Sequence, residues 1–121
     1  MTAAKGNVMN LQTQTRPKVL SVLVMEDRID AACAIQFKER MRDLTLTGDQ
    51  RVVLDLARVK FLDSSGLGAI VAVKKLLGPD RVLELSSLTP TVEKVFRLTR
   101  MDTIFTIHPT HEAAVSHAAS A

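Results

Sequence analysis

Short apolar runs and longer amphipathic stretches alternate along most of the chain. The short runs, rich in Val, Leu and Ile, predict β-strands at residues 8–14, 18–25, 52–56, 81–85 and 103–107. The longer stretches predict helices at residues 31–46, 67–77, 90–99 and from 110 onward. Arg16-Pro17 separates the first two strands, which are expected to pair as a hairpin. The alternation after that hairpin predicts an α/β domain, with a mixed, mostly parallel sheet of about five strands packed with about four helices.

Capping residues place the expected helix boundaries. Asp30 is a natural N-cap for the first helix, and Thr47-Gly48-Asp49 is a natural stop for it. Thr89 followed by Pro90 is a strong start signal for the third. The residues expected on inner faces recur at helical spacing and are Ala34, Phe37, Met41 and Leu44, then Val92, Val95, Phe96 and Thr99, then Ala113, Ala114 and Val115, with His111 outside.

The helix at 67–77 has two contrasting arcs on a helical wheel. The arc expected to face the core holds Ala69, Ile70, Val73, Leu76 and Leu77. The opposite arc holds Ser64, Leu67, Gly68, Val71, Lys74 and Lys75. Leu67 and Val71 on this outer arc either belong to a docking face or touch a neighbouring loop or helix, and the wheel supports both interpretations equally.

Composition indicates one globular domain. The chain has 121 residues, of which 46% are hydrophobic and 24% charged, enough for an aliphatic core without staples. We expect a flexible tail at residues 1–7 and a folded domain at 8–118. The single cysteine, Cys33, allows no internal disulfide, and its alanine-rich surroundings indicate a small buried residue rather than a nucleophile. The absence of a signal peptide or a transmembrane-length run predicts a cytoplasmic protein without membrane insertion.

The charge distribution argues against nucleic acid as a partner. The formal net charge is +3 and the pI about 9.4, but the basic residues are spread along the chain. Neither a basic run nor interleaved aromatic residues are present to track a phosphate backbone.

The junction at residues 61–68 carries the most specific chemistry. Phe61-Leu62-Asp63-Ser64-Ser65-Gly66-Leu67-Gly68 joins a short strand to a helix. Asp63 and Ser64 stand where a helix needs an N-cap, and both serine hydroxyls are expected near the positive end of the helix dipole. One interpretation is that Ser64 is simply the N-cap, contributing about 1 kcal/mol to stability.

This junction resembles the signature of STAS domains, and more narrowly that of bacterial anti-sigma factor antagonists. The resemblance rests on Val52-Val53-Leu54-Asp55-Leu56 followed by Asp63-Ser64-Ser65-Gly66-Leu67-Gly68, and it extends through 18–30, 87–101 and 104–115. It implies a STAS-type single domain that is not an enzyme. In this family the serine directly after the aspartate is phosphorylated, which implies Ser64 as the acceptor here.

The resemblance also implies the partners. The unphosphorylated protein would sequester an anti-sigma factor that is also a serine kinase, and phosphorylation of Ser64 would release it. A phosphatase would restore binding, and ATP would belong to the kinase, so no cofactor or metal is expected. The expected partner-binding residues surround the acceptor and are Asp30, Asp63, Ser65, Gly66, Leu67, Gly68 and Val71. The absent side chains of Gly66 and Gly68 are expected to let a partner approach the backbone.

The turn after the second strand departs from the family pattern. Many members begin it with glycine, whereas this chain reads Asp27-Arg28-Ile29-Asp30. The aspartate is retained and the glycine is not. The turn is expected at the same pole of the sheet as Ser64, so its altered charge bears on partner identity.

Other functions fit the residues less well. A serine hydrolase lacks its Gly-x-Ser-x-Gly elbow because Leu62 precedes Asp63-Ser64. His108, His111 and His117 form no recognisable metal-ligand pattern, and the glycines lack a Walker lysine. The main alternative keeps the fold: stand-alone STAS proteins also resemble accessory subunits of lipid-transport ATPases and stressosome-like scaffold components.

Overall fold

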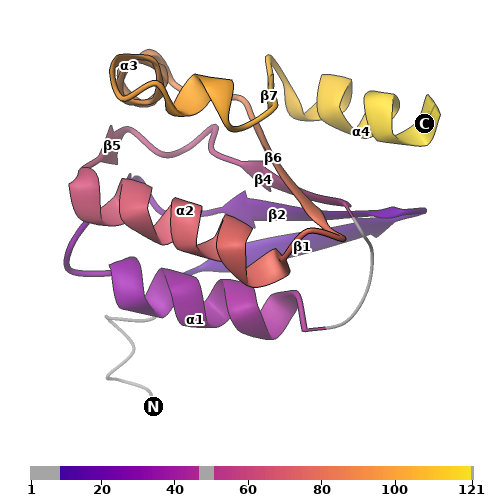
Figure 1. Cartoon of the computed structure of the whole chain (residues 1–121), viewed down its shortest axis with the longest axis horizontal. Helices are drawn as coiled ribbons and strands as arrows, with labels where there is room; N and C mark the ends of the chain where they lie inside the picture. Colours follow the sequence, from indigo (N-terminus) through magenta and orange to yellow (C-terminus); the bar gives the residue numbers. More distant parts are fainter. Residues whose placement is uncertain (1–8, 47–50, 121) are drawn as a thin grey trace.

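A five-stranded mixed sheet is the centre of the fold (Figure 1). The computed structural model describes residues 9–46 and 51–120. Its strands, in spatial order, are β1 (Leu11–Arg16), β2 (Val19–Val24), β4 (Arg51–Asp55), β6 (Val82–Ser86) and β7 (Ile107–His108). β1 and β2 form the expected antiparallel hairpin, and the remaining neighbours are parallel. The predicted sheet is confirmed, with the 52–56 strand at its centre.

Helices cover both faces of this sheet. α1 (Ala34–Leu44) and α2 (Ser64–Leu77) lie side by side on one face, and α4 (His111–Ser120) covers the other (Figure 1). α3 (Pro90–Leu98) follows β6 and leads into a short 3₁₀ helix, η2 (Met101–Thr103). No helix in the described ranges is long and apolar enough to cross a membrane.

The larger core lies between the sheet and the α1–α2 layer. It is aliphatic apart from Phe37, Phe96 and Phe105, and the last two rings meet edge to face with centroids 5.8 Å apart. The expected inward residues of α1 and α2 are buried, except that Leu44 is half-buried and Leu76 is exposed. Thr99, expected on the inner stripe of the third helix, is also exposed, because α3 has already ended at Leu98.

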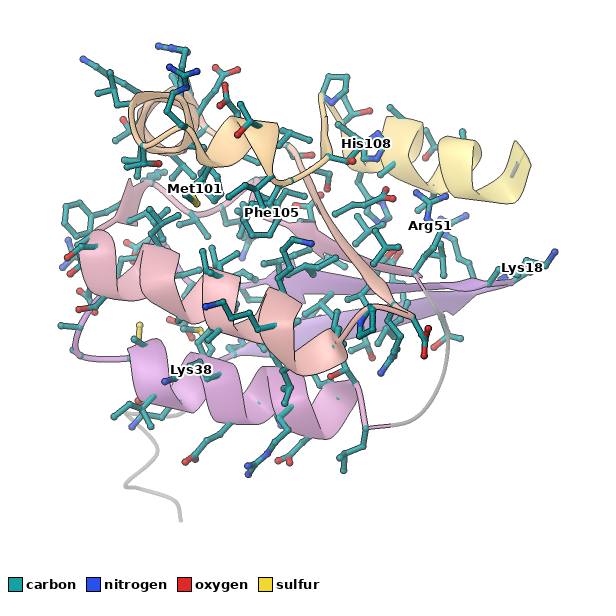
Figure 2. All side chains as sticks on the ribbon, in the orientation of Figure 1. Lys18, Lys38, Arg51, Met101, Phe105 and His108 are labelled. Atoms are coloured by element: carbon teal, nitrogen blue, oxygen red, sulfur yellow. The ribbon has the colours of Figure 1, made fainter. Side chains whose placement is uncertain are left out.

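The opposite face of the sheet is more polar beneath α4. Glu84 accepts a hydrogen bond from Arg51, and its Oε1 lies 2.7 Å from His108 Nε2. Arg51 and His108 are labelled in Figure 2. His111 was expected to face outward, but it is half-buried, with Nε2 2.9 Å from Ser21 Oγ. His108 is a residue of β7 and bonds to the neighbouring strand β6, whereas the contact with Ser21 directs the His111 ring from the start of α4 towards β2.

A second, two-stranded ladder was not predicted. β3 (Arg28–Ile29) and β5 (Phe61–Leu62) pair in parallel at the end of the main sheet where α2 begins. Two-residue strands carry no periodicity, so the sequence shows only a turn and a loop there. The ladder fixes the turn after β2 beside the start of α2, which confirms that the two lie at the same pole.

Several predicted boundaries were wrong. α1 begins at Ala34 rather than residue 31, because residues 31–33 form a turn. Of the strand expected at 103–107, residue 103 ends η2, residues 104–106 form a turn and connecting segment, and only residue 107 belongs to a strand, β7. The tail at 1–7, the start of the domain at residue 8 and the helix stop at 47–49 lie outside the described residues.

Gly66 and Gly68 allow a matched test of this packing. A Cβ added at Gly66 would lie 2.0 Å from the carbonyl oxygen of Ile29, whereas one added at Gly68 would meet nothing within 4 Å. We expect Gly66→Ala to lower the free energy of unfolding by about 3 kcal/mol through overpacking. We expect Gly68→Ala to raise it by about 0.5–1 kcal/mol, since alanine is the better helix former. Urea denaturation measures both, and equal effects would contradict the close approach of α2 to β3.

Candidate functional site

Asp63 joins the two segments that meet at the β3–β5 pole. It is the N-cap of α2, and its Oδ1 accepts a hydrogen bond from the Gly66 backbone N–H at 2.8 Å. Its other oxygen, Oδ2, accepts from the Ala31 N–H at 3.1 Å. One carboxylate therefore caps α2 and also holds the turn before α1, which leaves it little freedom to serve a partner directly.

Ser64 is the first residue of α2 and is exposed. The interpretation that Ser64 itself caps the helix is wrong, because Asp63 performs that role. The neighbouring Ser65 is also exposed, and neither hydroxyl makes a hydrogen bond to any residue that the structure describes. Both hydroxyls lie where the positive end of the helix dipole favours negative charge.

Asp30 organises the turn rather than the helix it was expected to cap. Its Oδ1 accepts from the Ala32 N–H at 3.0 Å, and its Oδ2 accepts from Arg28 Nη1 at 3.3 Å. Cys33 occupies the N-cap position of α1 without a side-chain capping bond. Asp30 is thus close in space to Asp63 through the Ala31 backbone, as the resemblance implies.

Asp27 takes the place of the family's glycine without strain. Its backbone is not among the positive-φ positions of the described chain, which are Lys18, Ser87, Arg100 and Gly78. Its carbonyl oxygen accepts from the Lys60 N–H at 2.7 Å, next to the β3–β5 ladder. The departure therefore changes surface charge and leaves the turn intact.

The two glycines of the motif have different surroundings. Gly66 is buried against Ile29, so its missing side chain serves internal packing, and the expectation that it admits a partner was wrong. Gly68 is exposed with open space around it, as that expectation requires.

Leu67 and Val71 are half-buried and pack against the main core. On the same flank of α2, the Lys74 ammonium lies 6.0 Å from the centroid of the Phe105 ring. Met101 and Phe105 lie between α2 and α3 (Figure 2). The interpretation that this flank touches a neighbouring segment is therefore favoured, and only the remaining surface of Leu67 and Val71 is available to a partner.

Arg28 and Phe61 are site residues that sequence reasoning missed. They face each other across the short ladder, with the guanidinium carbon 4.9 Å from the ring centroid and both side chains exposed. These two residues could have been found only by predicting that the segments of β3 and β5 pair, and two-residue strands show no periodicity that would indicate such pairing. The pair adds an exposed aromatic ring at the same pole as Ser64, and the guanidinium stacked on that ring is also ion-paired with Asp30.

Among the residues that the structure describes, no histidine lies at the pole beside Ser64 as a hydrolase would require. His108 and His111 bond to Glu84 and Ser21 beneath α4, on the other face of the sheet from α2. The side chain of His117 lies outside the described part of the chain. Burial raises the pKa of the Cys33 thiol, with the Asp30 carboxylate as a further cause, so this thiol is a poor nucleophile.

Sheet order, helix placement and the Asp-Ser start of α2 together define a STAS fold. A family model described as "STAS domain" matches residues 10–114. The chain belongs to the STAS domain family.

Its relatives narrow the class. "Putative anti-sigma factor antagonist BtrV" of Bordetella bronchiseptica is 30% identical over 105 residues, which cover 84% of this chain and 90% of the relative. An anti-sigma factor antagonist from Mycobacterium paratuberculosis has a similar structure, with a TM-score of 0.81, 23% identity and coverage of 92% and 94% of the two chains. The Bacillus protein SpoIIAA in its phosphorylated form gives a TM-score of 0.67 at 18% identity, covering 90% and 99%. These matches confirm the resemblance to anti-sigma factor antagonists.

Because Asp63 and not Ser64 caps α2, substitutions at these two adjacent residues should differ in their effect on stability. Asp63→Ala should lower the free energy of unfolding by about 1–2 kcal/mol, because the Gly66 and Ala31 N–H groups lose their acceptor. Ser64→Ala should change it by no more than about 0.5 kcal/mol, because the hydroxyl has no partner in the described residues. Thermal unfolding followed by circular dichroism measures both, and a larger loss for Ser64→Ala would overturn the assignment.

Cys33 should react slowly with iodoacetamide in the folded protein. The thiolate is the reactive form, and the raised pKa of Cys33 reduces its fraction at pH 8. Intact-mass measurements should show alkylation slower than in 8 M urea, with a rate that keeps rising above the pH at which an ordinary cysteine, of pKa about 8.5, has levelled off. Equal rates with and without urea would contradict the burial of this thiol.

Proposed function

We propose that the protein is an anti-sigma factor antagonist switched by phosphorylation of Ser64. Unphosphorylated, it binds and sequesters an anti-sigma factor that is also a serine kinase, and the sigma factor is thereby freed. Phosphorylation of Ser64 by that kinase breaks the complex, and a phosphatase restores it. The protein itself is a cytoplasmic binding module without catalytic activity, and ATP is bound by the kinase.

The observation that carries this proposal is the position of Ser64. Its exposed hydroxyl opens α2, and the adjacent Asp63 is occupied by the Gly66 and Ala31 N–H groups. A kinase can therefore reach the hydroxyl without unfolding the helix. The helix cap does not depend on the residue that is modified.

The electrostatics of the pole support a switch in affinity rather than in fold. A phosphoserine carries about −1.5 to −2 charges at pH 7, which the start of a helix tolerates. The Asp63 carboxylate already lies next to the modified residue, whereas that of Asp30 is paired with Arg28. The phosphate would therefore add like charge beside Asp63, and a partner that packs against the unmodified pole would have to desolvate this anion.

The relatives support the same function. BtrV and the Mycobacterium paratuberculosis protein are both named as anti-sigma factor antagonists, the first with the qualifier putative. SpoIIAA has been solved both with and without phosphorylation, and both forms share this fold. A phosphorylated form of the same fold is consistent with a switch that leaves the backbone largely unchanged.

Mass spectrometry of the protein purified from its native cells tests the proposal. We expect one phosphate, located on Ser64, and a co-purified ATP-binding anti-sigma factor. An unmodified Ser64 together with a transporter ATPase or a large self-assembly would reject the proposal in favour of an accessory or scaffold role.

Binding measurements then test the switch itself. Calorimetry with the co-purified kinase should show Ser64→Ala binding as tightly as the wild type, but resisting phosphorylation. Ser64→Asp should bind at least about 100-fold more weakly, a loss of about 2.8 kcal/mol. Ser65→Asp, one residue away and equally exposed, is the matched control and should cost less. Unchanged affinity of Ser64→Asp would contradict the electrostatic basis of the switch.

A further inference from the structure

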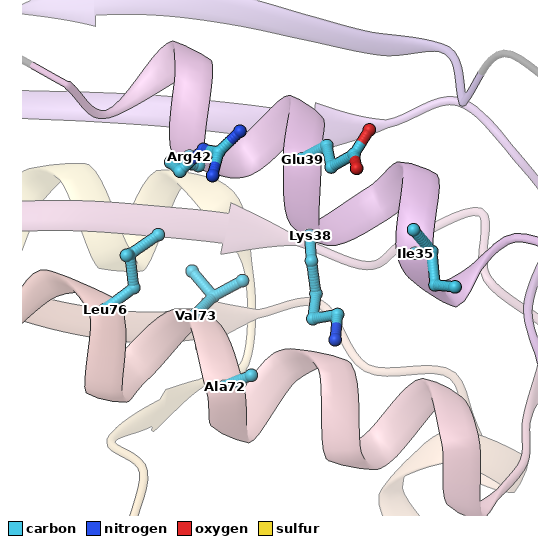
Figure 3. A pocket seen from close by; sticks show the side chains of 7 residues that line it. All are labelled: Ile35, Lys38, Glu39, Arg42, Ala72, Val73 and Leu76. Carbon is cyan, nitrogen blue, oxygen red and sulfur yellow. The ribbon is translucent and has the colours of Figure 1, made fainter.

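A groove separates α1 from α2 on the side of the helices that is turned away from the sheet (Figure 3). It has a volume of about 310 Å³, and Ile35 of α1 and Leu76 of α2 are its apolar walls. These two side chains are 62% and 50% exposed and lie towards opposite ends of the hollow, whereas Val73, beside Leu76, is buried. Large aliphatic groups left exposed on both sides of one hollow are typical of a binding surface.

The rim of the groove is mainly cationic. Lys38 extends from α1 across towards α2, and Arg42 and Glu39 follow along the same helix (Figure 3). Lys75, beside Leu76, is exposed on α2. Neither Lys38 nor Arg42 forms an ion pair within the described ranges, so their charge is available. The surface is therefore complementary to an apolar segment with acidic flanks.

The groove is continuous with the Ser64 pole. At about 100° per residue, one narrow arc of α2 runs from the pole into the groove and holds Ser65, Gly68, Ala72 and Leu76. The other flank of α2 is covered towards Phe105, as Lys74 shows. A molecule seated on Ser64 can thus extend along α2 in one direction, over two small residues that permit close approach.

We infer that this groove binds an amphipathic helix of the same anti-sigma factor. The helix would place aliphatic side chains against Ile35 at one end of the groove and Leu76 at the other, and acidic side chains opposite Lys38 and Arg42. Recognition of an amphipathic helix by an apolar groove is a recurrent mode of peptide binding. A second copy of this chain is a poorer occupant, since its groove would bring the same excess of positive charge.

This inference rests on the proposed function and divides the interface into two parts. The pole at Ser64 determines whether the partner binds, because the phosphate is added there. The groove determines which partner binds, because its walls and rim contact the partner whether or not the distant hydroxyl is modified. Complementary charge and shape at such a secondary contact separate closely related partners.

Site-specific photocrosslinking in the native cells tests the inference. The photocrosslinker p-benzoylphenylalanine replaces Ile35 or Leu76 in the groove, and Ser65 as the reference position on the pole. Leu98 of α3 is the control, since it is an aliphatic residue with 71% exposure on another element. We expect both groove positions to crosslink to the same anti-sigma factor as position 65. The crosslinked peptide of that factor should contain acidic residues. Position 98 should not crosslink to it.

The outcomes separate the two proposals. If Ser65 captures the anti-sigma factor while the groove positions capture nothing, a second copy or a different molecule, the groove inference is wrong and the proposed function stands. If no position captures an anti-sigma factor, both fail. Capture from Leu98 as well would show contact without preference for the groove and would also overturn the inference.

A charge reversal gives the quantitative test. Lys38→Glu should lower the affinity for the purified anti-sigma factor by at least about tenfold at low salt, and by less at high salt, because exposed charges are screened. Lys94→Glu makes the same change in net charge on α3 and should have little effect. Equal losses for the two variants would mean that only overall charge matters, and the groove would then have no specific role.

Discussion

The carboxylate of Asp63 is the interaction on which the pole of this domain depends. It is shared between the Gly66 N–H in α2 and the Ala31 N–H in the turn before α1. Two segments more than thirty residues apart in sequence are thereby held at one point. The same carboxylate completes the helix start, so the exposed serine that follows it is not needed for capping.

Close packing between α2 and β3 reinforces the connection that the Asp63 carboxylate makes. Gly66 brings the first turn of α2 against the backbone of β3, where any larger residue would meet the Ile29 carbonyl oxygen. The β3–β5 ladder adds two paired residues on each side. Together these contacts connect the backbone around Ser64 to β3 and to the turn before α1. Such a connected backbone suits the proposed switch, which would act by adding charge and would need no conformational change.

Sequence reasoning recovered the sheet, its hairpin and the position of the exposed serine, because these depend on apolar periodicity and on a specific motif. It failed where local signals were too short. The β3–β5 ladder has no period. The residues at 103–107 are β-formers, yet only the last of them belongs to a strand. Asp30 fits a helix cap although it caps a turn. The role of Gly66 was wrong for a related reason: a missing side chain indicates close approach, but the sequence does not say by which chain.

The two flanks of α2 explain how one helix can be both a structural and a binding element. Its Leu67–Val71–Lys74 flank is partly covered by the segment that carries Phe105, which ties it to the core. Its other flank descends past Gly68 and Ala72 to the walls of the α1–α2 groove, where Leu76 is left exposed by the packing of Leu77 and Val73 beneath it. Because this second flank is the more open of the two, a partner seated on Ser64 could extend its contact along it towards α1. In the function that we propose, the cations of α1 would add selectivity for an acidic segment, and phosphorylation of Ser64 would control release.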